Sequence, residues 1–253
     1  MKKKKSFGQH FLKDETLCER IVDAARIERG DLVVEIGPGQ GALTNYLPQE
    51  RSILVELDRE LIDDLRGRYP LATVIRDDAA SIDFDHLAGD RPWVLIGNLP
   101  YNAANAIMMN ALRTNGGLRR LIVMVQKEVA DRMLAPPGPN RGVLSVAVQL
   151  HGDVSRVMDV RPGSFVPPPN VMSSVVRLDI NPRADDPEAL MVMVSAGFSS
   201  RRKQLHKNLA TAGFATSDQV KQSLRSVGIR EDIRAQDLSV DNWIALQGCL
   251  MAR

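Results

Sequence analysis

The chain contains a glycine-rich stretch whose spacing suits close contact between backbone and ligand. Gly37, Gly39 and Gly41 stand at alternating positions directly after the apolar run 32–36. Glycines in a turn that follows a strand let the backbone approach a ligand without Cβ clashes. We expect a helix from about Ala42, with its N-terminus directed toward that ligand. The G-x-G-x-G spacing differs from the dinucleotide form G-x-G-x-x-G, so the stretch predicts a nucleotide-binding turn but not its type.

A single acidic residue extends this prediction. Glu56 ends the second apolar run of the chain, 15 residues after Gly41. A carboxylate at that place can accept hydrogen bonds from both hydroxyls of a ribose. The alternative role is that of a solvated acid at a strand end. The glycine turn and the carboxylate together predict an adenosine-containing cofactor, either S-adenosylmethionine or a nicotinamide dinucleotide.

Residues 98–101 distinguish between these two cofactors. They are Asn98, Leu99, Pro100 and Tyr101, and they follow another apolar run. The Asn98 side chain can direct its oxygen at an amine, and the proline fixes the direction of the next carbonyl. Tyr101 can stack on a base whose amine is held in this way. Hydride transfer needs none of these groups, so the stretch favours methyl transfer to an amine; an ordinary Asn-Pro turn is the alternative.

Apolar runs that alternate with helical patterns must position these residues. The expected strands cover 32–36, 52–57, 72–76, 93–97 and 121–125. Apolar residues recur at helical spacing over 14–28, where Gly30 is the expected stop, and over 59–69. This alternation predicts a parallel, doubly wound sheet that is buried on both faces.

The pattern changes after residue 140. A helix is expected over 143–150, followed by β segments over 158–160 and 173–180. Pro162 and the triple proline 167–169 lie between the two β segments and indicate a stiff loop. These late strands are expected to add an antiparallel edge to the sheet.

A polar, proline-containing stretch over 181–187 indicates a domain boundary. The remainder, 188–253, is expected to be helical, with Gly213 and Gly228 as helix stops. We therefore expect one domain over 1–181 and a helical, RNA-binding domain over 182–253.

The composition is that of a globular protein. Hydrophobic residues make up 44% of the chain and charged residues 25%, and the net charge is +2. No stretch approaches the roughly 18 apolar residues of a membrane span, and the basic start lacks the apolar segment of a signal peptide. The two cysteines, Cys18 and Cys249, lie far apart and outside any metal-ligand spacing. We expect a cytoplasmic protein with neither a disulfide framework nor a metal site.

Positive charge is concentrated in two clusters. One is the lysine run 2–5, and the other comprises Arg201, Arg202, Lys203, His206 and Lys207. Such clusters can neutralise phosphates, and the release of counterions then favours binding of nucleic acid. The alternative is a solvated terminus and an exposed helix face.

Several stretches in this order resemble the ribosomal RNA adenine dimethyltransferases. They are residues 6–12, 35–44, 55–58, 97–102, 126–130, 165–169 and 201–205. The resemblance spans most of the chain and is closer to the bacterial small-subunit branch, because the large-subunit branch usually has Asn-Ile-Pro-Tyr at 98–101 and Asn in place of His10. It implies a Rossmann-like class I methyltransferase fold, in which a mostly parallel seven-stranded α/β sheet is followed by a small C-terminal all-helical domain.

The resemblance also implies roles for individual residues. Cofactor binding would involve Gln9, His10, Leu12, Gly37, Gly39, Gly41, Glu56, Asp78 and Asn98, of which the first three would close over the methionine part. The target amine would be held by Asn98 and by the carbonyls of Leu99 and Pro100, and the target base would lie between Tyr101 and Phe165. RNA contacts would come from Arg201, Arg202, Lys203 and Lys207. Two alternatives stay open: Asp77 could replace Asp78 at the cofactor's adenine, and Phe165 could be a core anchor.

The implied activity is the transfer of methyl groups from S-adenosylmethionine to N6 of two adjacent adenines near the 3′ end of 16S rRNA. The implied partner is small-subunit ribosomal RNA within a pre-ribosomal subunit, with the protein as a monomer. The competing functions are a nicotinamide-dependent oxidoreductase and a non-catalytic factor of ribosome assembly. The chain departs from the family at 102–106 and 170–174 and is shorter over 46–53; these differences concern the shape of the target loop.

Overall fold

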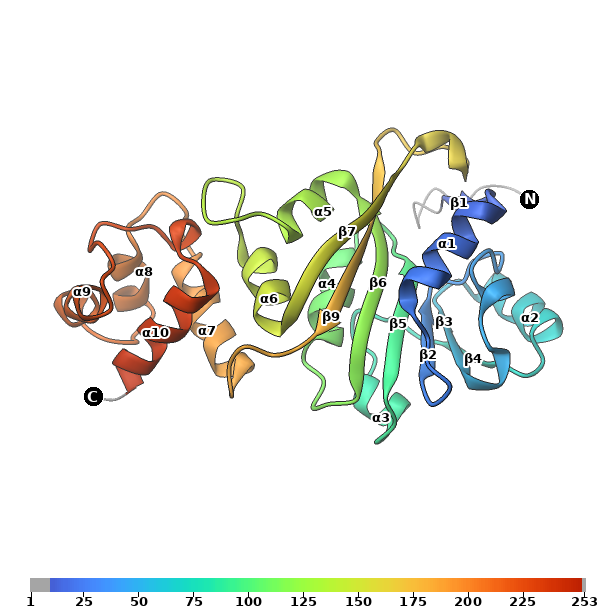
Figure 1. Ribbon diagram of the computed structural model, residues 1–253, viewed down its shortest axis with the longest axis horizontal. Helices are drawn as coiled ribbons and strands as arrows, with labels where there is room; N and C mark the ends of the chain where they lie inside the picture. The colour runs from blue at the N-terminus through green and yellow to red at the C-terminus, as the bar shows by residue number, and fades with distance from the viewer. Residues whose placement is uncertain (1–9, 252–253) are drawn as a thin grey trace. The chain divides into compact units, whose positions relative to one another are not determined.

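A seven-stranded sheet dominates the first of two compact units in the computed structural model, which describes residues 10–251 (Figure 1). The strand order is β4-β3-β2-β5-β6-β9-β7. The strands are β2 (Leu32–Ile36), β3 (Ser52–Glu56), β4 (Thr73–Arg76), β5 (Trp93–Asn98), β6 (Leu118–Gln126), β7 (Gly152–Val160) and β9 (Ser173–Ile180). The predicted strands are confirmed, although β7 is longer than expected and begins at Gly152.

The central strands of this sheet run parallel. β2 pairs with β3 and with β5, β3 pairs with β4, and β5 pairs with β6, all in parallel register. β9 is antiparallel to β6, as expected for a late strand. The carboxyl ends of parallel strands lie at one edge of a sheet. The turns that follow β2, β3 and β5 therefore come together at that edge.

Helix α1 (Glu15–Ala25) covers one face of the sheet. It begins after Asp14, whose side chain accepts a hydrogen bond from the Leu17 amide at 3.1 Å and so caps the helix. It ends at Arg26, which has a left-handed backbone (φ 44). The stop expected at Gly30 is therefore wrong. The buried face of α1 packs against alternate residues of the strands, namely Val33, Val94, Ile96, Ile122 and Met124.

Helices that follow successive strands complete the unit. They are α2 (Arg59–Arg68), α3 (Phe84–Ala88), α4 (Ala104–Ala111) and α5 (Lys127–Met133). Figure 1 shows α1 in front of the sheet and α4 behind it. Val34 and Leu95, which alternate with the residues under α1, are fully buried. Both faces of the sheet are thus covered, as predicted for a doubly wound fold.

Residues 42–51, all of which the structure describes, contain no α-helix, contrary to expectation. They form turns and two short 3-10 segments, η1 (Thr44–Tyr46) and η2 (Gln49–Arg51). Leu47 between them is extended (φ −91, ψ 151). A residue that precedes a proline disfavours the helical conformation, and Pro48 follows Leu47. The segment between the glycine turn and this proline is too short for an α-helix to develop.

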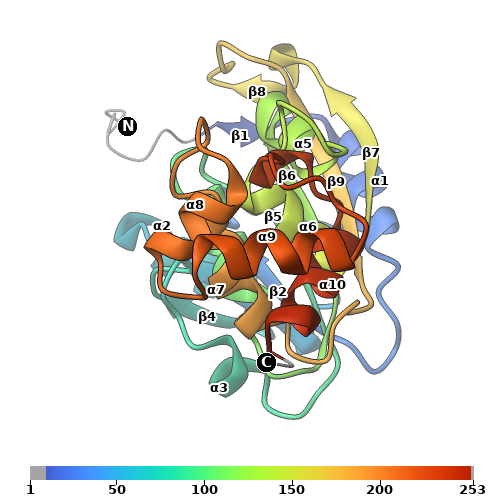
Figure 2. The same ribbon diagram turned by 90° about the vertical axis from the view of Figure 1, so that its left-hand side faces the viewer.

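The second compact unit is helical and comprises residues 131–153 and the chain from 181 onward. Its helices are α6 (Val143–His151), α7 (Pro187–Gly197), α8 (Leu205–Thr211), α9 (Ser217–Ser226) and α10 (Val240–Met251) (Figure 2). Gly213 (φ 81) and Gly228 (φ 73) follow α8 and α9 in the left-handed conformation that ends many helices. The two predicted helix stops are confirmed.

Helix α6 belongs to the core of this second unit. Its residues Val146 and Leu150 are fully buried in one apolar cluster with Leu190, Val194 and Trp243. The expected division at 181–182 agrees with the end of β9 but assigned α6 to the first domain. No helix among residues 10–251 is long and apolar enough to cross a membrane.

Candidate functional site

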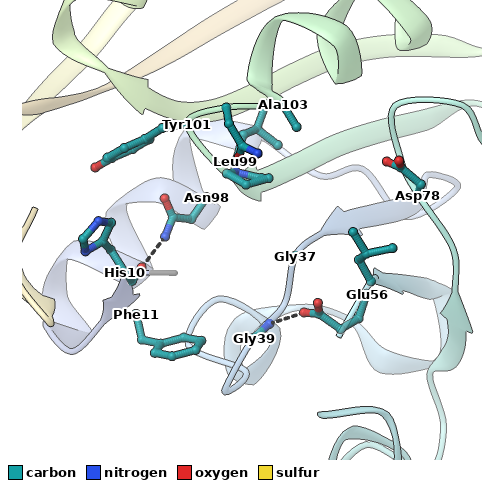
Figure 3. A pocket seen from close by; sticks show the side chains of 13 residues that line it. His10, Phe11, Gly37, Gly39, Glu56, Asp78, Asn98, Leu99, Tyr101 and Ala103 are labelled. Carbon is teal, nitrogen blue, oxygen red and sulfur yellow. Dashed lines mark hydrogen bonds between the residues drawn. The ribbon is translucent and has the colours of Figure 1, made fainter. Parts of the chain in front are cut away.

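A cleft of about 210 Å³ lies at the carboxyl edge of the sheet, beside the ends of β2, β3 and β5 (Figure 3). Its lining consists of His10, Phe11, Gly37, Gly39, Glu56, Leu57, Asp78, Asn98, Leu99, Pro100, Tyr101, Asn102 and Ala103. Nine of the predicted site residues are in this set. The fold thus brings together side chains from stretches that are far apart in the sequence.

The glycine turn forms one wall of the cleft. Gly37 and Gly39 have positive φ values, 64 and 57, which residues other than glycine rarely adopt. A Cβ at position 39 would lie 2.8 Å from the Phe11 ring. Glycine at 39 therefore lets the aromatic ring of Phe11 lie against the turn, as Figure 3 shows. The predicted role of these glycines in backbone approach has a clear steric basis.

Gly41 lies outside the lining of the cleft. Its φ is 81, and a Cβ there would lie 2.0 Å from the hydroxyl oxygen of Tyr69. Tyr69 is held in place by a hydrogen bond from its hydroxyl to Oδ1 of Asn45 at 2.7 Å. The structure thus gives the third glycine a packing role against Tyr69, and its contact with a cofactor stays a prediction.

The carboxylate of Glu56 is fixed by two backbone amides. Its Oε2 accepts from the Gly39 N–H at 3.1 Å, and its Oε1 accepts from the Asp58 N–H at 2.9 Å. Burial raises the pKa of Glu56, while these amides favour the ionised form and lower it. The side chain is 5% exposed and faces the cleft, where its remaining lone pairs can accept from hydroxyl groups.

The structure separates the two aspartates that follow β4. Asp78 lines the cleft, whereas Asp77 does not. Oδ1 of Asp77 accepts from the Asp78 amide at 2.7 Å, and Oδ1 of Asp78 accepts from the Ala80 amide at 2.9 Å. Asp77 therefore supports the turn, and Asp78 is the residue that presents a carboxylate to the cleft.

The amide of Asn98 has a defined orientation. Its Nδ2 donates to the backbone carbonyl of His10 at 2.8 Å. Its Oδ1 consequently faces the other way, toward the side of the cleft where Tyr101 lies (Figure 3). An oxygen in this position can accept a hydrogen bond from an amine, whereas the flipped amide could not.

The carbonyls of Leu99 and Pro100 differ in availability. The Pro100 carbonyl accepts from the Ala103 amide at 3.0 Å and from the Ala104 amide at 2.9 Å. These two bonds use both of its lone pairs. The Leu99 carbonyl accepts no backbone amide from the residues that the structure describes. Of the two predicted carbonyl acceptors, Leu99 is therefore the one left to bind an amine.

The two aromatic residues predicted to hold a base lie in different environments. Tyr101 lines the cleft, and its hydroxyl shares a 2.7 Å hydrogen bond with Oγ of Ser173. Burial raises the pKa of Tyr101, so this hydroxyl stays neutral near pH 7. Phe165 is 1% exposed and packs in the core beneath α1. The geometry favours the core-anchor alternative for Phe165.

Phe165 belongs to a small sheet that the sequence analysis missed. In it β1 (Phe11–Leu12) pairs antiparallel with β8 (Phe165–Val166). The His10 ring extends this connection, because its Nδ1 donates to the carbonyl of Pro167 at 2.7 Å. Segment 10–13, which we call the strap, thus joins the glycine turn, Asn98 and the loop that contains the triple proline 167–169. Strands of two residues are too short to show the alternation of apolar and polar residues by which a strand is predicted from sequence.

Two further predicted residues, Gln9 and Leu12, are not among the described residues that line the cleft. Gln9 lies outside the described residues, and Leu12 lines a separate cavity of about 30 Å³ next to the cleft. Four lining residues were not predicted, namely Phe11, Leu57, Asn102 and Ala103. The sequence signal for Leu57 is its place, as a large apolar residue directly after the Glu56 carboxylate.

A second buried carboxylate lies at the small cavity. Glu35 is 1% exposed, and its Oε2 accepts from the Thr44 hydroxyl at 2.7 Å. Burial raises the pKa of Glu35 to about 8, although the Thr44 hydrogen bond opposes the shift. Within the described part of the chain, no three His, Cys, Asp or Glu side chains are grouped to hold a metal ion.

The predicted RNA-contacting cations lie in the second unit. Arg201, Arg202, Lys203 and Lys207 are all exposed, at the start of α8 or just before it. Arg201 differs from the others because its Nη2 donates to the carbonyls of Pro139 and Arg141. The lysine run 2–5 lies outside the described residues.

Comparison with known proteins identifies relatives over the whole chain. A family model described as ribosomal RNA adenine dimethylase matches residues 1–250. A protein of Acidobacterium capsulatum named ribosomal RNA small subunit methyltransferase A is 39% identical over 97% of this chain and 90% of its own. The protein of the same name from Synechococcus elongatus is 38% identical over 97% of this chain and 94% of its own.

Two solved structures have a similar fold over most of this chain. A dimethyladenosine transferase from Plasmodium falciparum has a TM-score of 0.78 at 26% identity and covers 94% of this chain and 96% of its own. The 23S rRNA methyltransferase ErmE has a TM-score of 0.73 at 24% identity and covers 95% of this chain and 99% of its own. The second of these likenesses supports the fold alone.

Proposed function

The chain belongs to the ribosomal RNA adenine dimethylase family, and from this premise we propose that it transfers methyl groups from S-adenosylmethionine to N6 of two adjacent adenines near the 3′ end of 16S rRNA. The observation that carries the proposal is the orientation of Asn98, whose amide nitrogen is engaged by His10 so that its oxygen faces the cleft. An amine acceptor beside a nucleotide-binding turn suits methylation of an amino group. The orientation does not suit a hydride-transfer enzyme, which has no amine to bind.

The residues of the cleft fit the adenosine part of the cofactor. Glu56 presents a fixed carboxylate that suits ribose hydroxyls, and Asp78 presents one that suits the amine of the cofactor's adenine. Because Gly37 and Gly39 carry no side chains, the backbone of this turn can approach the cofactor closely. His10 and Phe11 lie at the other end of the lining, where they would contact the methionine part. S-adenosylmethionine, when bound, supplies a methyl group activated by its positively charged sulfur.

The target amine would be held by two acceptors. These are Oδ1 of Asn98 and the carbonyl of Leu99, since Pro100 uses its own carbonyl within the turn. The lone pair of an adenine amine is delocalised into the ring, which makes the amine a weak nucleophile. Two hydrogen bonds to its hydrogens would draw the nitrogen toward tetrahedral geometry and stabilise the positive charge that develops on it. Alignment of the reacting atoms can contribute up to ~7–11 kcal/mol in favourable cases.

The base must leave its stack to reach the cleft. Tyr101 would then offer a stacking surface, and base stacking on an aromatic side chain is worth about 1–3 kcal/mol. Its hydrogen bond to Ser173 keeps the ring in place. Because Phe165 is in the core, we assign the stacking surface to Tyr101 alone and treat Phe165 as the anchor of the loop that contains the triple proline 167–169.

The helical unit would bind the RNA backbone through its exposed cations, Arg202, Lys203 and Lys207 above all. Phosphate contacts carry no base information and would position the enzyme without selecting the target bases. The partner would be small-subunit ribosomal RNA in a pre-ribosomal subunit, bound by a monomer in the cytoplasm.

The proposal is tested by incubating the purified protein with labelled S-adenosylmethionine and small or large ribosomal subunits that lack these modifications. We expect labelled N6,N6-dimethyladenine in small-subunit RNA and none with the Asn98→Ala variant. Label in large-subunit RNA alone would contradict the choice of substrate while leaving the reaction type intact. No transfer to either subunit, with cofactor binding retained, would favour a non-catalytic assembly factor.

A further inference from the structure

One of the four cations in the RNA-contacting set is engaged within the protein. Nη2 of Arg201 donates to the carbonyl of Pro139 at 2.7 Å and to the carbonyl of Arg141 at 3.0 Å. Both carbonyls belong to the segment 135–142, which we call the proline loop of the helical unit. The described residues give Arg202 and Lys203 no comparable side-chain bond, and both are exposed. Arg201 therefore differs from its neighbours in its contacts.

The same loop is also fixed at its base. The guanidinium of Arg141 is buried, and its Nη1 donates to the carbonyl of Ala135 at 2.8 Å and to Oε1 of Gln149 at 2.7 Å. The Gly138 amide donates to the carbonyl of Gln236 at 2.9 Å, and the Arg141 amide donates to Gly138 at 3.0 Å. Arg201 completes this set of bonds from the outer side of the loop.

The tip of the loop is exposed although its ends are held. Pro136, Pro137, Pro139 and Asn140 are all on the surface. Prolines restrict the backbone and have no N–H to satisfy. A loop that is rigid before binding loses little conformational freedom when a partner binds. Because Arg201 is bonded to this loop and directly precedes Arg202 and Lys203, the loop lies beside the segment that carries these cations.

We propose that the proline loop of the helical unit is part of the RNA-binding surface, and that Arg201 is a positioning residue that holds it there. Arg202, Lys203 and Lys207 make the phosphate contacts, and Asn140 at the loop tip contacts the RNA beside them. This inference rests on the proposed function, since it assumes that the helical unit binds ribosomal RNA. It changes the role of Arg201 from a phosphate contact to a clamp.

The two roles of an arginine predict different dependences on salt. A side chain that contacts one phosphate contributes about 0.7–0.9 to the slope of log K against log salt concentration. Binding of unmodified small subunits is measured from low to high KCl for Arg201→Ala and for its matched control Arg202→Ala. We expect Arg202→Ala to reduce the slope, and Arg201→Ala to weaken binding about 10-fold at every salt concentration with an unchanged slope.

Hydrogen exchange of the loop amides distinguishes a clamp from a phosphate contact, because loss of a phosphate contact would leave the exchange rates of these amides unchanged. The Gly138 and Arg141 amides should exchange faster in Arg201→Ala and at the wild-type rate in Arg202→Ala. Arg201→Lys keeps the charge but lacks the reach and shape of the guanidinium, so we expect it to resemble Arg201→Ala in both measurements. Full wild-type binding by Arg201→Lys, or unchanged exchange in Arg201→Ala, would overturn the clamp.

Contact of the loop tip with RNA is tested separately. The thiol of an Asn140→Cys variant should react with a maleimide more slowly when small subunits are bound, relative to the same variant alone. Equal rates would overturn the contribution of the loop. If Arg202→Ala, Lys203→Ala and Lys207→Ala also bind normally, the RNA-binding role of the whole unit fails, which is a different result from failure of the clamp alone.

Discussion

Nδ2 of Asn98 donates to the backbone carbonyl of His10 at 2.8 Å, and this bond directs Oδ1 of Asn98 into the cleft. The orientation of the amine acceptor thus depends on the strap, 10–13. The strap is held in turn by the pairing of Phe11 and Leu12 with Phe165 and Val166. One segment therefore contacts the cofactor end of the cleft and orients the group that would bind the target.

Substitution of Asn98 should separate binding of the cofactor from methyl transfer. Asn98→Ala removes the acceptor, and the loss of one preorganised polar group at a reacting centre costs about 10²–10³-fold in kcat. Asn98→Asp keeps an oxygen but places a carboxylate beside the His10 carbonyl, where a donor is required. We expect both variants to lose activity while calorimetry shows the cofactor bound within a few-fold of wild type. Loss of cofactor binding to the same extent as activity would contradict the assigned role.

The His10 side chain should matter for the position of the strap. Its Nδ1 donates to the carbonyl of Pro167 at 2.7 Å. An asparagine can place its amide nitrogen near the same point. We therefore expect His10→Ala to lower kcat about 10-fold, in line with the loss of one hydrogen bond of about 1–1.5 kcal/mol, and His10→Asn to recover most of it. Equal kcat values for the two variants would show that this hydrogen bond does not position the strap.

The two aspartates after β4 can be distinguished by cofactor affinity. Asp78 lines the cleft and Asp77 does not. We expect Asp78→Ala to raise the Kd for S-adenosylmethionine about 10-fold, as expected for a lost hydrogen bond to a charged group. Asp77→Ala should have a smaller effect, because Asp77 acts only through its bond to the Asp78 amide. The reverse order in calorimetric titrations would assign the cofactor's adenine to Asp77.

Much of the fold and part of the site could be predicted from the sequence. Buried parallel strands are continuous apolar runs, so β2, β3 and β5 were recognisable. Because the ends of parallel strands share one edge, Gly37, Glu56 and Asn98 were expected to meet there, and they line one cleft.

Features that depend on packing between distant segments could not be predicted. The strap pairs with residues more than 150 positions away, and α6 packs with the second unit because its Val146 and Leu150 contribute to that apolar core. The carbonyl of Pro100 is lost as an acceptor only because the chain turns back on itself at 103–104. The prediction of a helix after Gly41 was wrong for a local reason that the sequence contains, because Pro48 disfavours the helical conformation at Leu47.

Glu35 should make the stability of the protein fall as the pH rises. Its pKa is about 8 in the folded protein, against an ordinary value of 4.5. The stabilisation is complete below pH 4.5, where both states are protonated, and is lost progressively as the pH rises toward 8, because the unfolded chain then releases a proton that the folded chain retains. The slope is up to about 1.4 kcal/mol per pH unit.

Glu35→Gln should remove this contribution to the pH dependence. Urea unfolding between pH 5 and pH 8 should give a flatter profile for the variant than for the wild type. The matched control is Glu28→Gln. The hydrogen bond from Arg119 lowers the pKa of Glu28, so this carboxylate is ionised in both the folded and the unfolded protein between pH 5 and pH 8. Identical profiles for the wild type and Glu35→Gln would show that Glu35 ionises normally in the folded protein.

Gly41 should be required for stability rather than for binding alone. Its backbone is left-handed, and an added Cβ would lie 2.0 Å from the Tyr69 hydroxyl oxygen, which is held by Asn45. We expect Gly41→Ala to lower the free energy of unfolding by about 2–4 kcal/mol, from overpacking and backbone strain together. Gly30→Ala is the control, because nothing lies within 4 Å of a Cβ there. Similar urea midpoints for the two variants would contradict the packing role of Gly41.

Phe165 and Tyr101 should differ in which property their substitution changes. Phe165 is 1% exposed in the core, so Phe165→Leu should lower the free energy of unfolding by about 1 kcal/mol or more and leave kcat within a few-fold of wild type. Tyr101 lines the cleft, so Tyr101→Leu should keep the urea midpoint near that of the wild type. Its kcat should fall about 10-fold or more, since stacking of one base is worth about 1–3 kcal/mol. A fall in kcat for Phe165→Leu as large as that for Tyr101→Leu, at equal stability, would return Phe165 to the base-binding site and would require the loop that carries it to rearrange when RNA binds.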